Sequence, residues 1–203
     1  MNNIKYKLKL LDATDVLVAI NILMFALTLL YSRGLQPNTQ ALVDFGGNAT
    51  SYMKYGHEYW RFFTSMFLHA NIIHLLVNMY SLKILGSTVE KIFGRRNFMI
   101  VYLFSGITGS AASYLVNTIM NANSLSVGAS GAIFGLLGLL LSQKFIEKRN
   151  IMKGKLKRYV NIDYNNLIVI ILVNLVIGFS ISNIDNSAHI GGLIGGFLLG
   201  LIL

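Results

Sequence analysis

The chain has 203 residues, of which 54% are hydrophobic and only 12% are charged. A soluble domain carries roughly 25% charged residues, so this composition excludes a water-soluble globular protein and predicts a membrane domain. The net charge of +9 does not indicate nucleic-acid binding, because basic residues in membrane proteins mark cytoplasmic loops. The absence of cysteine excludes disulfides and thiolate metal sites.

Six apolar segments recur along the chain, and each approaches the length of about 20 residues with which a helix crosses the hydrocarbon core. Because lipid offers no partner to exposed backbone groups, each segment is expected to be a helix. In chain order the segments cover residues 16–31, 72–85, 98–116, 129–143, 167–181 and 189–203. The sequence therefore predicts an all-α polytopic membrane protein, with residues 1–203 as a single domain.

The start of the chain resembles a signal peptide, because three lysines precede the apolar run from Val16. That run ends in LLYSRG without a small-x-small cleavage site, so we expect an uncleaved first transmembrane helix. Fourteen of the 17 Lys and Arg residues lie before this helix or in the connections 83–96 and 144–158. This bias predicts cytoplasmic termini, with residues 1–13 inside and the connection 32–61 outside at the membrane interface.

Four polar residues fall within or at the ends of these apolar segments, where they are costly unless they face a partner or a cavity. His74 and Asn78 are four residues apart and share one face of the second helix. Ser130 begins the fourth helix and His189 begins the sixth. Since these three helices all run inward, the four residues are expected at one depth, just below the outer surface.

Glycines explain how these residues could meet. Gly192 and Gly196 are spaced as GxxxG on the sixth helix, and the fourth helix carries Gly131, Gly135 and Gly138 on one stripe. Small residues allow helix backbones to approach closely. We therefore expect the fourth and sixth helices to bring Ser130 within hydrogen-bond reach of His189.

This grouping contains the parts of a serine hydrolase site. A serine hydroxyl becomes a nucleophile when a base takes its proton, and His189 is the natural base. His74, the Asn78 amide and the Ser130 backbone N–H are candidate donors to an oxyanion. Each residue taken singly also admits a structural role as a cap, an anchor or an interhelical hydrogen bond. Asp185, one turn before His189, could orient its ring or act as a solvated cap.

Five motifs in this order resemble the rhomboid family of intramembrane serine proteases. They are EYWRFF, HANIIHLLVN, GSTVEKIFG, GASGAIFG and AHIGGLIGG. The resemblance spans about residues 58–200 and implies a six-helix bundle. It implies a Ser130–His189 dyad, oxyanion stabilisation by His74 and Asn78, and Phe134 packed against the histidine ring. It assigns structural positions to His69 and the Trp60–Arg61 pair, and suggests residues 167–181 as the gate for substrate.

The function implied is hydrolysis of peptide bonds in or next to transmembrane segments of other membrane proteins. The expected partners are such substrates and the lipid bilayer, with no nucleic acid, metal or cofactor. A prokaryotic plasma membrane is the expected location, with the site opening to the outside. The competing classes are a catalytically inactive relative that binds transmembrane clients and a transporter. Against the transporter, the polar residues gather at one depth and the sequence shows no paired inverted repeat.

Overall fold

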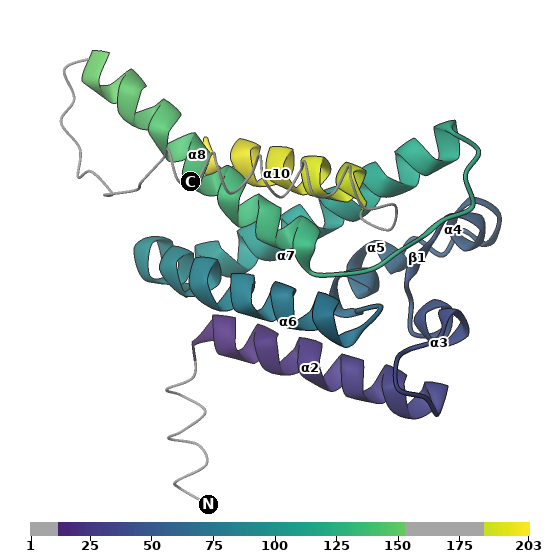
Figure 1. The fold of residues 1–203 in the computed structure, drawn as a ribbon. Coiled ribbons are helices and arrows are strands. Elements are labelled where there is room, and N and C mark those ends of the chain that lie inside the picture. Colours follow the sequence, from purple (N-terminus) through teal and green to yellow (C-terminus); the bar gives the residue numbers. More distant parts are fainter. Residues whose placement is uncertain (1–11, 153–184) are drawn as a thin grey trace, which may run out of the picture.

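The computed structural model describes residues 12–152 and 185–203, which form a predominantly helical bundle (Figure 1). The predicted segment 167–181 lies outside the described residues. The longer helices are α2 (Ala13–Ser32), α6 (Ile72–Ser81), α7 (Ser87–Ile119), α8 (Ser130–Met152) and α10 (Asn186–Gly200). Within residues 12–152 and 185–203, three helical stretches are long and apolar enough to cross a membrane, namely Ala13–Ser32, Ile72–Ile119 and Ser130–Glu147.

The sequence predicts two helices, over residues 72–85 and 98–116, with a connection between them. In the structure no loop follows residue 85. A π-helical turn, η2 (Leu82–Gly86), continues α6 directly into α7. Within α7, the backbone leaves helical geometry only at Gly94, where φ is 82° and ψ is 158°. After Gly94, α7 runs back across the bundle (Figure 1). Lys83 and Lys91 are exposed, so their charges lie on a helix surface and do not require a loop.

The start of α2 is attached to this turning region by Glu90. Its carboxylate accepts hydrogen bonds from the backbone N–H groups of Ala13 at 2.7 Å and Thr14 at 2.9 Å, and from the Thr14 hydroxyl at 2.8 Å. The first N–H groups of a helix have no acceptor within the helix. Glu90 supplies one from a distant part of the chain, and an ion pair between Lys83 and Asp15 adds to the contact.

The centre of the bundle is the packing of α10 against α7 and α8. Glycines make this contact close: a Cβ added to Gly192 would collide with the backbone of Gly131, and one added to Gly196 would collide with that of Gly135. A Cβ on Gly138 would meet the Phe197 backbone nitrogen at 2.8 Å. The predicted close approach of the helices that carry Ser130 and His189 is therefore present.

Residues 33–71 form a structured connection between α2 and α6. It contains α3 (Thr39–Asp44), β1 (Asn48–Ala49), α4 (Thr50–Gly56), α5 (Arg61–Thr64) and the 3-10 turn η1 (Ser65–Phe67). Strand β1 pairs antiparallel with β2 (Leu125–Ser126), placing Asn48 opposite Ser126. This pairing joins the connection to the segment just before α8.

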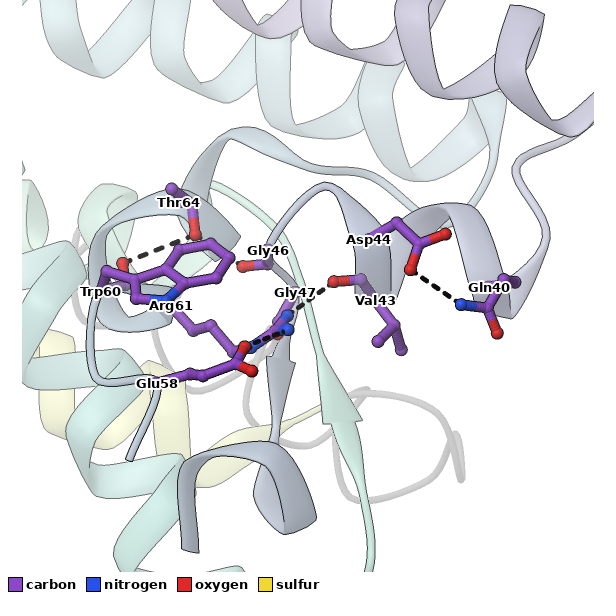
Figure 2. A network of polar contacts seen from close by, with 9 residues as sticks. All are labelled: Gln40, Val43, Asp44, Gly46, Gly47, Glu58, Trp60, Arg61 and Thr64. Atoms are coloured by element: carbon purple, nitrogen blue, oxygen red, sulfur yellow. Dashed lines mark hydrogen bonds and ion pairs between the residues drawn. The ribbon is translucent and has the colours of Figure 1, made fainter. Parts of the chain in front are cut away.

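Arg61 holds the connection together from its interior, as Figure 2 shows. The residue is only 3% exposed, and its guanidinium donates to the carbonyls of Val43 at 2.6 Å and Gly47 at 3.0 Å. Its Nε donates to the Glu58 carboxylate at 2.7 Å, and the guanidinium lies 4.6 Å from the centre of the Trp60 ring. The contacts of the Trp60–Arg61 pair therefore hold the connection between α2 and α6 in its fold.

Candidate active site

Ser130 is the first residue of α8 and follows a tight backbone turn. Gly128 has φ of 130°, a conformation that a residue with a side chain rarely adopts. The Gly128 N–H donates to the Ser65 carbonyl at 3.0 Å, which ties the turn to η1. The N–H of Ser130 belongs to the first helical turn, whose donors have no acceptor within the helix.

His189 lies in the first turn of α10 and points toward Ser130. Its Nε2 is 2.9 Å from the Ser130 Oγ, although 59 residues separate the two in sequence. The histidine is 8% exposed, whereas Ser130 is half-buried. This is the hydrogen-bond geometry that a nucleophile and its general base require.

The Phe134 ring packs on the imidazole of His189. The ring centres are 4.3 Å apart and the planes differ by 5°, which is a stacked arrangement. Phe134 is one helical turn after Ser130 on α8, so the same helix presents the serine and the ring beside the histidine. The contact limits the orientations open to the imidazole.

His74 and Asn78 lie on α6 beside the turn that precedes Ser130. A Cβ built on Gly128 would be 2.8 Å from both Cε1 and Nε2 of the His74 ring and 3.8 Å from the Ser130 Oγ. The imidazole and the serine hydroxyl therefore face the same small space. Asn78 is 5% exposed, and its Nδ2 donates one hydrogen to the His74 carbonyl at 2.9 Å, leaving the second amide hydrogen for another acceptor.

A third histidine, His69, is fully buried. Its ring meets that of His74 edge-on, with 5.1 Å between ring centres. Neither ring nitrogen of His69 has a hydrogen-bond partner among the described residues, so the ring supports His74 by packing.

Among the described residues, the Asp185 carboxylate makes no hydrogen bond to the His189 ring. Its Oδ1 accepts from the Ala188 N–H at 3.1 Å, which makes it the cap of α10, and its other oxygen accepts from the Ser113 hydroxyl. Of the two roles left open by the sequence, the structure shows the cap. Ser113 was not singled out in the sequence, because a serine inside an apolar helix gives no local signal of a partner 72 residues away.

A second buried network was also invisible in the sequence. Asn48 Nδ2 donates to the Ser110 carbonyl at 2.7 Å and lies 2.8 Å from its hydroxyl, and the hydroxyls of Ser65 and Ser110 are 3.1 Å apart. The network connects β1, η1 and α7 beneath the Gly128 turn. Among the residues that the structure describes, no group of three or more His, Cys, Asp or Glu side chains could hold a metal ion.

Comparison with known proteins identifies the family of the chain. The family model described as "Rhomboid domain" matches residues 56–203. The chain is 44% identical to "Rhomboid protease GluP" of Bacillus subtilis over 184 residues, covering 91% of this chain and 33% of that protein. It is 36% identical to "Putative rhomboid protease YdcA" of the same organism over 146 residues, covering 71% of this chain and 67% of that protein.

A plant protein is also similar. "RHOMBOID-like protein 6, mitochondrial" of Arabidopsis thaliana is 40% identical over 169 residues, covering 83% of this chain and 52% of that protein. The chain thus spans from about a third to two thirds of the length of these relatives. With the domain matched from residue 56 to residue 203, the chain belongs to the rhomboid family, whose domain is a polytopic helical membrane fold.

Proposed function

We propose that this chain is an intramembrane serine endopeptidase that hydrolyses peptide bonds in or next to transmembrane segments of membrane-protein substrates. Ser130 is the nucleophile and His189 is the general base. The observation that carries the proposal is the 2.9 Å contact between the Ser130 Oγ and the His189 Nε2. Membership of the rhomboid family and the description of GluP as a rhomboid protease support the same activity.

The reaction follows from these two groups. His189 Nε2 takes the proton of the Ser130 hydroxyl as the Oγ attacks the scissile carbonyl, and the resulting imidazolium gives that proton to the departing amine. The products of this half-reaction are an ester on Ser130 and a free amino terminus. Water then attacks the ester with His189 again as base, which releases the carboxyl product and restores the serine.

Negative charge on the carbonyl oxygen is stabilised by donors around Ser130. The backbone N–H of Ser130 points from a helix N-terminus, where the helix dipole favours an anion. The His74 imidazole and the second Asn78 amide hydrogen are the side-chain donors. Removal of one such donor typically costs about 10²–10³ in turnover. Phe134 keeps the His189 ring in place during both proton transfers.

The proposed topology is a single domain over residues 1–203 with six membrane helices and cytoplasmic termini, in a prokaryotic plasma membrane. The charge bias in the sequence supports this orientation. The first residues of α6, α8 and α10 lie on the same side of the bundle as α3, α4 and α5 (Figure 1). The site then opens to the extracytoplasmic side, where the water needed for hydrolysis is available.

The activity is tested with purified protein in proteoliposomes that contain a model transmembrane substrate. The wild type is expected to cleave the substrate, and Ser130→Ala and His189→Ala are expected to be inactive. A fluorophosphonate probe should label the wild type and leave Ser130→Ala unlabelled, which tests the nucleophile without a natural substrate. Equal cleavage by all three proteins would overturn the proposal.

The oxyanion donors need a control for folding. His74→Ala is expected to lower kcat about 10²–10³-fold with little change in thermal stability, because the ring is proposed to act on the reaction. His57→Ala removes an exposed histidine on the outer connection and should retain wild-type turnover. If His74→Ala lowers thermal stability enough for the unfolded fraction to account for the loss of turnover, that histidine has a structural role.

A further inference from the structure

Asp185 holds the first turn of α10 through three separate contacts. Its Oδ1 accepts from the Ala188 N–H at 3.1 Å, and its backbone carbonyl accepts from the His189 N–H at 3.3 Å. Its remaining carboxylate oxygen accepts from the Ser113 hydroxyl of α7. One residue therefore accepts from two consecutive backbone N–H groups, those of Ala188 and His189.

The His189 side chain has few constraints of its own. Its Nδ1 is buried without a hydrogen-bond partner among the described residues, whereas in a Ser-His-Asp triad a carboxylate binds that nitrogen and orients the ring. The Phe134 stack limits the tilt of the ring plane but supplies no hydrogen bond that fixes the position of the ring within that plane. The position of the imidazole therefore depends on where the backbone of α10 begins.

Ser113 links this helix start to a rigid neighbour. It is 1% exposed on α7, and its carbonyl and hydroxyl both accept from Asn117 Nδ2, at 2.9 Å and 3.4 Å. With its oxygen accepting from Asn117, the Ser113 hydroxyl hydrogen is directed to Asp185. The series of bonds thus runs from α7 through Ser113 and Asp185 to the first turn of α10.

We propose that Ser113 and Asp185 are positioning residues for the catalytic histidine. They fix the position of the first turn of α10 relative to α7. This position brings the His189 Nε2 to the Ser130 Oγ. The carboxylate acts on the backbone of the histidine, in contrast to the carboxylate of a triad, which acts on the ring. This inference rests on the proposed protease function.

The proposal predicts a specific pattern of variants in the full chain in proteoliposomes. Asp185→Ala removes the cap and the link to α7, and is expected to lower kcat at least tenfold with KM nearly unchanged, since a displacement of about 1 Å costs on the order of 10²-fold. Asp185→Asn keeps an acceptor for the Ala188 N–H and a partner for Ser113, and caps helices as well as aspartate does, so it should restore activity to within about threefold. A triad-like role for the charge would instead leave Asp185→Asn as impaired as Asp185→Ala, which would overturn the proposal.

Ser113→Ala is a milder second variant, because the Asp185 cap remains. It is expected to lower kcat less than Asp185→Ala, and the double variant should be no slower than Asp185→Ala alone, because residues that act through one series of contacts are not additive. The matched control is Thr108→Ala, which removes a hydrogen bond from α7 to the Gly191 carbonyl away from the α10 start and should keep wild-type kcat.

The rate of fluorophosphonate labelling of Ser130 gives a readout that does not depend on substrate binding. Labelling should slow in Asp185→Ala and Ser113→Ala in proportion to kcat and stay normal in Thr108→Ala. Wild-type kcat and labelling in both Asp185→Ala and Ser113→Ala would overturn the inference while leaving the protease function intact. Failure of the protease function would appear separately, as cleavage that persists in Ser130→Ala.

Discussion

Gly192→Ala is expected to separate Ser130 from His189 while leaving both side chains chemically intact. A Cβ on Gly192 would lie 2.7 Å from the Gly131 carbonyl carbon and 3.1 Å from its Cα, whereas ordinary van der Waals contact begins at 3.4 Å. The colliding atoms belong to the α8 backbone and cannot rotate away. Because helices pack without free space, α8 and α10 must move apart by roughly 1 Å.

That movement is enough to break the hydrogen bond between Ser130 and His189. The Ser130–His189 distance of 2.9 Å would become about 4 Å, and no hydrogen bond remains beyond about 3.6 Å. We expect kcat to fall on the order of 100-fold, with the same loss in the rate of fluorophosphonate labelling. The assay compares both rates in proteoliposomes.

The matched control is Gly131→Ala, on the opposite side of the same helix contact. A Cβ there would meet its nearest neighbour, the Ala188 carbonyl oxygen, at 3.3 Å, which a shift of a few tenths of an ångström relieves. Its kcat should stay within a few-fold of the wild type. Similar rates for Gly192→Ala and Gly131→Ala would refute the argument that the glycine contact sets the distance between the catalytic groups.

Three further substitutions test other contacts. Phe134→Ala removes the ring stacked on His189, and since an aromatic pair contributes about 0.5–1.5 kcal/mol, kcat should fall up to about tenfold; a wild-type kcat would show that the stack is not needed. Arg61→Ala leaves Glu58 and two backbone carbonyls without their donor and should lower the free energy of unfolding in detergent by about 3 kcal/mol. A loss below about 1 kcal/mol would match an exposed ion pair instead. Glu90→Ala removes the acceptor for the start of α2 and should cost about 2–3 kcal/mol in the same measurement, whereas Glu90→Gln, which keeps an acceptor oxygen, should cost less than half as much.

The sequence was most informative where the physical signal is local. The glycine spacing around Gly131 and Gly192 predicts close helix packing without knowledge of the fold, and the structure places Ser130 and His189 in contact. The spacing of His74 and Asn78 likewise fixes a shared helix face. These signals depend only on helical periodicity and residue size.

The sequence was least informative where the outcome depends on a distant partner. Asp185 lies four positions before His189, a spacing that fits both a cap and an orienting carboxylate, and Ser113 on another helix donates to the second oxygen of the capping carboxylate. The basic residues from Lys83 onward predict a loop, because charge alone does not distinguish a loop from the exposed face of a helix. Only the fold shows that the chain stays helical as far as Gly94.

The pairing of β1 with β2 has a consequence for how small an active fragment can be. A fragment trimmed to the matched domain, residues 56–203, would discard β1 and leave Leu125–Ser126 without its partner strand. It would also deprive Arg61 of the Val43 and Gly47 carbonyls. The segment that precedes Ser130 would then lack its partner strand, so the structural unit that holds Ser130 in place begins before residue 56.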